Sequence, residues 1–123
     1  MEEVNFKVVQ GDTFAIRVIY KNSNGTPINL SGYSAKMDVR NEPSGKILCA
    51  SINEQSGIII TPSTGTLDIE FNPSQTRKFT LPSAAYQLQI RSSNGTQTTI
   101  LKGYISTSSA VIRWHIITYQ LKE

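Results

Sequence analysis

The chain has 123 residues, 38% of them hydrophobic, and its twelve lysines and arginines against nine acidic residues give a net charge of +3. This size predicts one compact, soluble domain with a single core. The longest apolar runs, such as Ile58-Ile59-Ile60, are too short for a membrane helix of roughly 20 residues, so we expect no membrane association. Basic residues are scattered, with Arg77-Lys78 as the one adjacent pair, so we expect no nucleic-acid partner.

The amino terminus and the cysteine content indicate where the chain is made. Met1-Glu2-Glu3 is acidic where a signal peptide needs a basic segment, and no apolar run follows it. Cys49 is the only cysteine, which excludes an intramolecular disulfide and indicates a reducing compartment. We interpret Cys49 as a small core thiol, because its neighbours are apolar and no cation lies beside it in the sequence.

The strongest predicted strands show strict alternation of apolar and polar residues. Between residues 14 and 21 every second residue, from Phe14 to Tyr20, is large and apolar, which is the period of a strand with one buried face. The same period recurs at residues 33–40, 67–71 and 86–91. We expect the inward faces of these four segments to form the core.

Weaker patterns predict four further strands, in which apolar and β-branched residues are frequent but alternate less strictly. They are residues 5–9, 47–52, 57–61 and 98–105. Dipeptides such as Asn24-Gly25 and Asn94-Gly95 separate the segments and predict tight hairpin turns. A short helical turn is predicted at residues 73–78, because Asn72 can cap it and Pro73 suits its first position.

The order of these elements predicts an all-β fold. Turn signals recur about every ten residues, and no long helical segment is present to connect parallel strands. We therefore expect an antiparallel two-sheet sandwich of about seven to nine strands. We assign the sandwich domain to residues 1–109 and treat residues 110–123 as a C-terminal strand or extension.

A search for chemistry in the sequence finds no pattern that favours catalysis. His115 is the only histidine, so a histidine metal cluster and a second imidazole for proton relay are excluded by counting. Asp68 and Glu70 should share one face of a strand, and we interpret them as the solvated side of a sheet. No glycine-rich phosphate loop occurs. We expect no cofactor, no metal site, no catalytic residue and no enzyme activity.

Gly11-Asp12-Thr13 opens a series of motifs that spans residues 8–107. It precedes a strand, and residues 25–40 then read Gly-Thr-Pro-Ile-Asn-Leu-Ser-Gly-Tyr-Ser-Ala-Lys-Met-Asp-Val-Arg. Later motifs fall at residues 57–60, 64–69, 73–76, 85–90, 93–96 and 100–103. Together these motifs resemble a family of small proteins of tailed bacteriophages.

This resemblance implies a fold and a biological setting. The family is similar to the immunoglobulin-like amino-terminal domains of phage baseplate upper proteins, which act as attachment or assembly pieces. The matching motifs are mostly turns and core positions, so the resemblance implies an immunoglobulin-like sandwich of a virion and no catalytic or ligand-binding residue. The corresponding location is the virion, after synthesis in the cytoplasm of the host bacterium.

The C-terminal segment, residues 110–121, departs from the family pattern because it is longer and more apolar than a closing tail. If it is extended, apolar residues fall on both of its faces. It is either a final core strand of the same domain or an edge that binds another subunit, and one strand can do both. The residues that we predict for such an interface are Ile112, Trp114, Ile116, Tyr119 and Leu121.

The sequence therefore favours a non-enzymatic structural protein of a phage particle, in its tail, baseplate, neck or head decoration. Its expected partners are copies of itself, as a homo-oligomer, and other virion proteins. The alternative is a host-recognition module that binds surface carbohydrate through exposed aromatic side chains. Tyr33 and Tyr104 are the candidates for that role.

Overall fold

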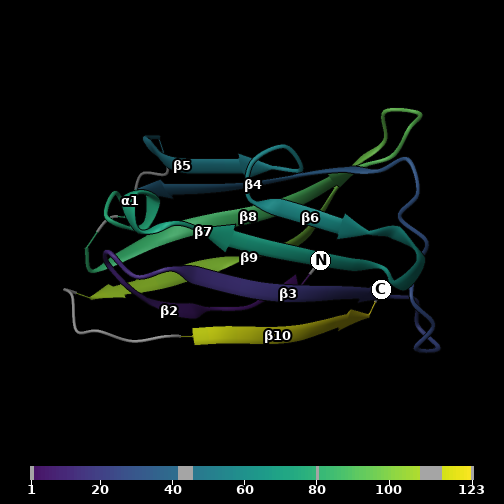
Figure 1. Ribbon diagram of the computed structural model, residues 1–123, viewed down its shortest axis with the longest axis horizontal. Helices are drawn as coiled ribbons and strands as arrows, with labels where there is room; N and C mark the ends of the chain where they lie inside the picture. Colours follow the sequence, from purple (N-terminus) through teal and green to yellow (C-terminus); the bar gives the residue numbers. More distant parts are fainter. Residues whose placement is uncertain (1, 42–45, 80, 109–114, 123) are drawn as a thin grey trace.

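The computed structural model describes residues 2–41, 46–79, 81–108 and 115–122, and of residues 115–122 only the strand that they form (Figure 1). The strands are β1 (Glu2–Glu3), β2 (Phe6–Val9), β3 (Phe14–Lys21), β4 (Ser34–Asn41), β5 (Leu48–Asn53), β6 (Ile58–Thr61), β7 (Thr66–Phe71), β8 (Ser83–Arg91), β9 (Gln97–Ser108) and β10 (His115–Lys122). Two short helical turns, η1 (Pro62–Thr64) and α1 (Pro73–Thr76), complete the elements. No helix in these ranges is long and apolar enough to cross a membrane.

The strands form two sheets that pack face to face. The larger sheet has the order β1-β9-β8-β4-β5, with β2 also paired to β9, and the smaller sheet has the order β10-β3-β7-β6. In an immunoglobulin domain strands B, E and D form one sheet, and strands C, F and G form the other. Here β3, β7 and β6 take the first set of positions, β4, β8 and β9 take the second, and β5 adds a C′ strand. The predicted immunoglobulin-like sandwich is therefore confirmed.

Three parallel pairings stand out in a sandwich that the turn signals predict to be antiparallel. Both β1 and β2 run parallel to β9, and β10 runs parallel to β3. Phe6 lies opposite Ile105, and Phe14 lies opposite His115. Strand β9 thus runs beside β2 in the larger sheet, and β10 runs beside β3 in the smaller sheet. Turn dipeptides report only local hairpins, which is why the sequence did not predict these distant pairings.

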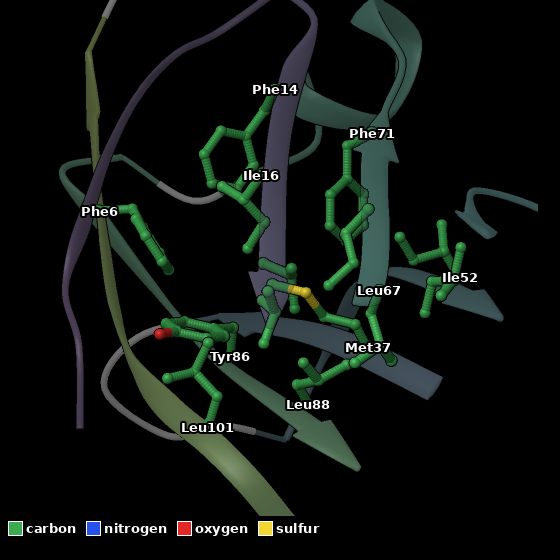
Figure 2. Packing of buried hydrophobic residues seen from close by; sticks show 14 of the residues in the cluster. Phe6, Phe14, Ile16, Met37, Ile52, Leu67, Phe71, Tyr86, Leu88 and Leu101 are labelled. Carbon is green, nitrogen blue, oxygen red and sulfur yellow. The ribbon is translucent and has the colours of Figure 1, made fainter. Parts of the chain in front are cut away.

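Aromatic rings join the two sheets through the core. Phe6 lies 5.6 Å from Phe14 and 5.5 Å from Tyr86, measured between ring centroids. Phe71 stacks on Phe14 at 6.4 Å and meets the edge of Phe79 at 5.4 Å. Figure 2 shows Phe14 and Phe71 on the same side of the core, with Tyr86 across from them. Such ring contacts add about 0.5–1.5 kcal/mol each beyond the burial of their area.

Alternation identifies the inward faces correctly. In β3 the side chains of Phe14, Ile16 and Val18 are buried, while Arg17 between them is exposed. Strands β4 and β8 show the same alternation. The predicted helical turn is present as α1, and Asn72 and Gln75 form a reciprocal capping box at its start. Cys49 is half-buried and packs against the core.

Candidate protein interface

The predicted interface at the C-terminus lies partly in the described chain. Ile112 and Trp114 fall outside the described residues. Ile116, Tyr119 and Leu121 belong to β10, where their backbones lie opposite those of Ala15, Val18 and Tyr20 in β3. Strand β10 is the outermost strand of the smaller sheet in the described order. The role of these five residues in binding a partner stays a prediction.

The outer face of the smaller sheet carries an exposed apolar side chain beside an ion pair. Ile59 of β6 is 68% exposed, and its neighbour across the strand pair is Asp68. Arg17 Nε donates to Asp68 Oδ1 at 2.7 Å. This hydrogen bond and the negative charge of Asp68 raise the pKa of Arg17. Ile59, Arg17 and Asp68 line a surface hollow of about 540 Å³. Glu70 lines it too, because side chains two apart on a strand point to the same face of the sheet.

Strand β5 forms the edge of the larger sheet. Apart from contacts of Asn53 with the turn that follows, a bridge to Gly57 and a hydrogen bond from Ser56 N, its described backbone pairs only with β4. Ile47 and Leu48, where the strand begins, are 65% and 47% exposed. Residues 48–53 contain neither proline nor a charged residue, which are the features that usually protect an edge. Strand β5 lacks these two protections, although a β-bulge interrupts its pairing with β4 between Val39 and Arg40.

The outer face of the larger sheet is polar and charged. Ser51 Oγ donates to Asp38 Oδ1 at 2.6 Å, and Arg40 lies 3.4 Å from the other carboxylate oxygen. Beside them is a hollow of about 370 Å³, which Tyr104 also lines. Tyr104 is 50% exposed, so one of the two aromatic candidates for carbohydrate binding does lie on the surface. Among the described residues, no group of three or more potential metal ligands occurs on this face or elsewhere.

Tyr33, the second aromatic candidate, lies at a different place from Tyr104. It lines a groove at the end of the sandwich, together with Tyr20. Both tyrosines are half-buried and pack against the core. The alternation of residues 14–21 places Tyr20 on the inner face of its strand and does not indicate this pair. The nearby Asn24-Gly25 and Asn94-Gly95 turns are a signal that could have placed the two tyrosines at the loop end.

Comparison with known proteins finds likenesses among solved structures. No family model and no curated protein matches the chain. A solved structure of Drosophila OTK, extracellular domains 3–5, is similar over 89% of this chain and 33% of that chain, with 12% sequence identity and a TM-score of 0.35. This chain thus spans about a third of the length of that structure. The immunoglobulin-like fold follows from the strand order and pairing described above.

Proposed function

We propose that this chain is a non-enzymatic structural module of a tailed-bacteriophage particle, joined to copies of itself and to other virion proteins through its sheet edges. The phage setting rests on the sequence motifs of residues 8–107. In the fold, Gly11-Asp12-Thr13 forms the connection between β2 and β3. Residues 25–33 belong to the connection between β3 and β4, and the rest of that motif enters β4. These two motifs therefore lie in turns and in a strand, the positions that a shared scaffold requires.

The open edge of β5 is the observation that carries the proposal. An edge strand presents backbone N–H and C=O groups that another strand can pair with. The exposed side chains of Ile47 and Leu48 add apolar area at the same edge. Residues 48–53 carry no charged side chain, so the strand itself lacks the charges that often keep a second strand away.

Repetition in a particle makes a modest contact sufficient. Symmetric assemblies use the same interface many times, and linked contacts raise the overall avidity without any new interaction. Two edges on one module, β5 and β10, allow it to be held from two directions. A module with two such edges is better suited to linking neighbouring subunits than to binding one partner tightly.

The oligomeric state in solution tests this proposal. Light scattering coupled to size-exclusion chromatography on the full chain should give a defined oligomer whose fraction rises with concentration. Leu48→Lys should lower that fraction, because a charge at the edge strand opposes pairing. Leu81→Lys is the matched control, since Leu81 is also exposed but lies outside β5. A wild-type chain that stays monomeric at every concentration would contradict self-association.

A further inference from the structure

A groove at one end of the sandwich has both aromatic and aliphatic lining residues. Tyr20 at the end of β3 and Tyr33 before β4 line it, together with the half-buried Ile28 and the buried Ile90. Its volume is about 460 Å³, within the range of about 300–1,000 Å³ that is typical of small-molecule sites. The remaining lining residues are polar: Asn22, Ser92, Asn94, Thr96 and Thr98.

Two hairpin loops with the same sequence and the same backbone hydrogen bonds reach this groove, one through Asn22 and the other through Asn94 and Thr96. Residues 23–26 and 93–96 both read Ser-Asn-Gly-Thr. Asn22 N donates to Thr26 O at 2.9 Å, and Ser92 N donates to Thr96 O at 2.9 Å. Each loop is closed by a further bond from its glycine N–H. Because both loops are held by their own bonds, the groove is largely formed before any ligand arrives.

The two asparagines in the groove keep a hydrogen-bond donor for a ligand. Asn22 Oδ1 accepts from the backbone N–H of Thr26 at 3.0 Å, and Asn94 Oδ1 accepts from that of Thr96 at 3.1 Å. Asn94 Oδ1 also accepts from the hydroxyl of Ser92. Within the part of the chain that the structure describes, neither Nδ2 atom donates a hydrogen bond to a protein group. Each amide nitrogen therefore offers donors at the rim.

The charge of the lining selects the class of ligand. No charged side chain occurs among the described residues that line the groove. By contrast, the hollow on the larger sheet is lined by Glu3, Asp38, Arg40 and Lys102. The described lining therefore offers an anionic or cationic ligand no counter-charge for the water that it would lose. A neutral ligand with apolar and hydroxylated parts would match both the tyrosines and the amides.

From these features we propose that the groove binds an uncharged sugar ring of a glycan. The C–H face of a pyranose can pack on the ring of Tyr33 or Tyr20, while its hydroxyls accept from the amides of Asn22 and Asn94. The groove also lies at the end where the β3–β4 and β8–β9 connections take the B–C and F–G loop positions. In immunoglobulin variable domains, loops at these positions bind ligands and are rich in Tyr, Ser, Gly and Asn.

The deciding experiment is a titration of the full chain followed by two-dimensional ¹H–¹⁵N NMR. The probes are the methyl pyranosides of glucose, galactose and N-acetylglucosamine, with glucuronic acid as the charged comparison. We expect at least one neutral probe to produce saturable shifts in the amides of residues 20–28 and 92–98. The expected dissociation constant is on the order of 1 mM, as for a single ring with few contacts.

Two variants separate binding from loop structure. Asn94→Asp keeps an acceptor oxygen for the loop but replaces the amide donor, so it should weaken neutral-sugar binding about tenfold while the loop amides keep their positions. Tyr33→Ala should abolish binding, and Tyr33→Phe, which keeps the ring, should retain most of it. Tyr104→Ala is the control, because Tyr104 lies outside the groove and its loss should change nothing.

Four results would overturn the inference. They are the absence of saturable shifts with every neutral probe, shifts confined to other residues, binding that both Asn94→Asp and Tyr33→Ala leave intact, and shifts of the groove amides that follow protein concentration alone. The last would assign the groove to a protein contact. The titration is repeated on Leu48→Lys, so that failure of the edge contact and failure of sugar binding remain distinguishable.

Discussion

Thr76 fixes the position of Gly11 across the end of the sandwich. The Thr76 hydroxyl accepts a hydrogen bond from the Gly11 N–H at 3.0 Å and donates one to the carbonyl of Asp12 at 2.8 Å. Thr76 is fully buried at the end of α1. Through these two hydrogen bonds, α1 holds the connection between β2 of the larger sheet and β3 of the smaller sheet.

Replacing Thr76 by Val should therefore destabilise the fold without changing the packed volume much. The variant leaves a part-buried N–H at Gly11 and a carbonyl at Asp12 without this partner, at a cost of about 1–3 kcal/mol. Urea unfolding followed by circular dichroism measures the difference. Thr76→Ser keeps the hydroxyl and should lie closer to wild type, and equal stability of the Val variant would show that the bridge contributes little.

Gly65 should tolerate no side chain. Its φ of +61° lies in the left-handed region, and a Cβ would come within 2.6 Å of the Tyr20 carbonyl oxygen and 2.8 Å of that of Ile28. We expect Gly65→Ala to lower the free energy of unfolding by more than about 1 kcal/mol, because it combines backbone strain with a steric clash.

Gly25→Ala is the control that isolates the clash at Gly65. Gly25 also has a positive φ, of +89°, but an added Cβ would meet nothing within 4 Å. It should therefore show only the strain of the backbone angle. Equal losses in the two variants, measured by thermal unfolding, would mean that the contacts of Gly65 with Tyr20 and Ile28 relax freely.

Phe79 should be among the most sensitive core positions, although it lies outside every strand. It is buried against Phe71, with its ring at 77° to the ring of Phe71. Phe79→Ala should cost about 3–5 kcal/mol by opening a cavity, and Phe79→Leu should cost clearly less. Both losses of stability can be measured by chemical denaturation, provided that the slope of the free energy of unfolding against denaturant concentration is the same for all variants. A loss below 1 kcal/mol for the Ala variant would contradict the packing described.

Trp114→Ala tests the predicted contact at the C-terminus. If residues 110–121 bind another subunit, the substitution should lower the oligomer fraction in light scattering while leaving the unfolding midpoint nearly unchanged. Tyr104→Ala provides an aromatic control from the outer face of the larger sheet. Assembly at the wild-type level in the Trp114 variant would remove this residue from the interface.

The sequence predicts those parts of the fold that depend on local chemistry. Alternation located the main strands because burial of one face of a sheet imposes a period of two. The cap of α1 was readable because an asparagine followed by a proline leaves little choice at a helix start. The turns at both Ser-Asn-Gly-Thr sites could be predicted because Asn-Gly favours the positive φ angles of tight hairpin turns.

The remaining features depend on contacts between distant segments. Phe79 follows the basic pair Arg77-Lys78 in a segment without a period, so only its contact with Phe71 of β7 in the folded chain makes it a core residue. The groove is equally non-local, because Tyr20 and Asn94 meet only after both sheets have formed. Alternation within a strand does not show which strands lie at the edges of a sheet. The position of β5 at an edge follows only from the strand order of the folded chain.

The parallel course of β9 and β10 beside β2 and β3 also governs how the chain folds. Strands β2 and β3 are synthesised early, yet their parallel partners, β9 and β10, lie nearly a full chain length further along. Closing so long a loop costs entropy before any contact compensates it, which favours slow folding, on the scale of milliseconds to seconds for sandwiches. Until residues 97–122 emerge from the ribosome, the nascent chain carries unpaired strands that a chaperone or a second chain can capture.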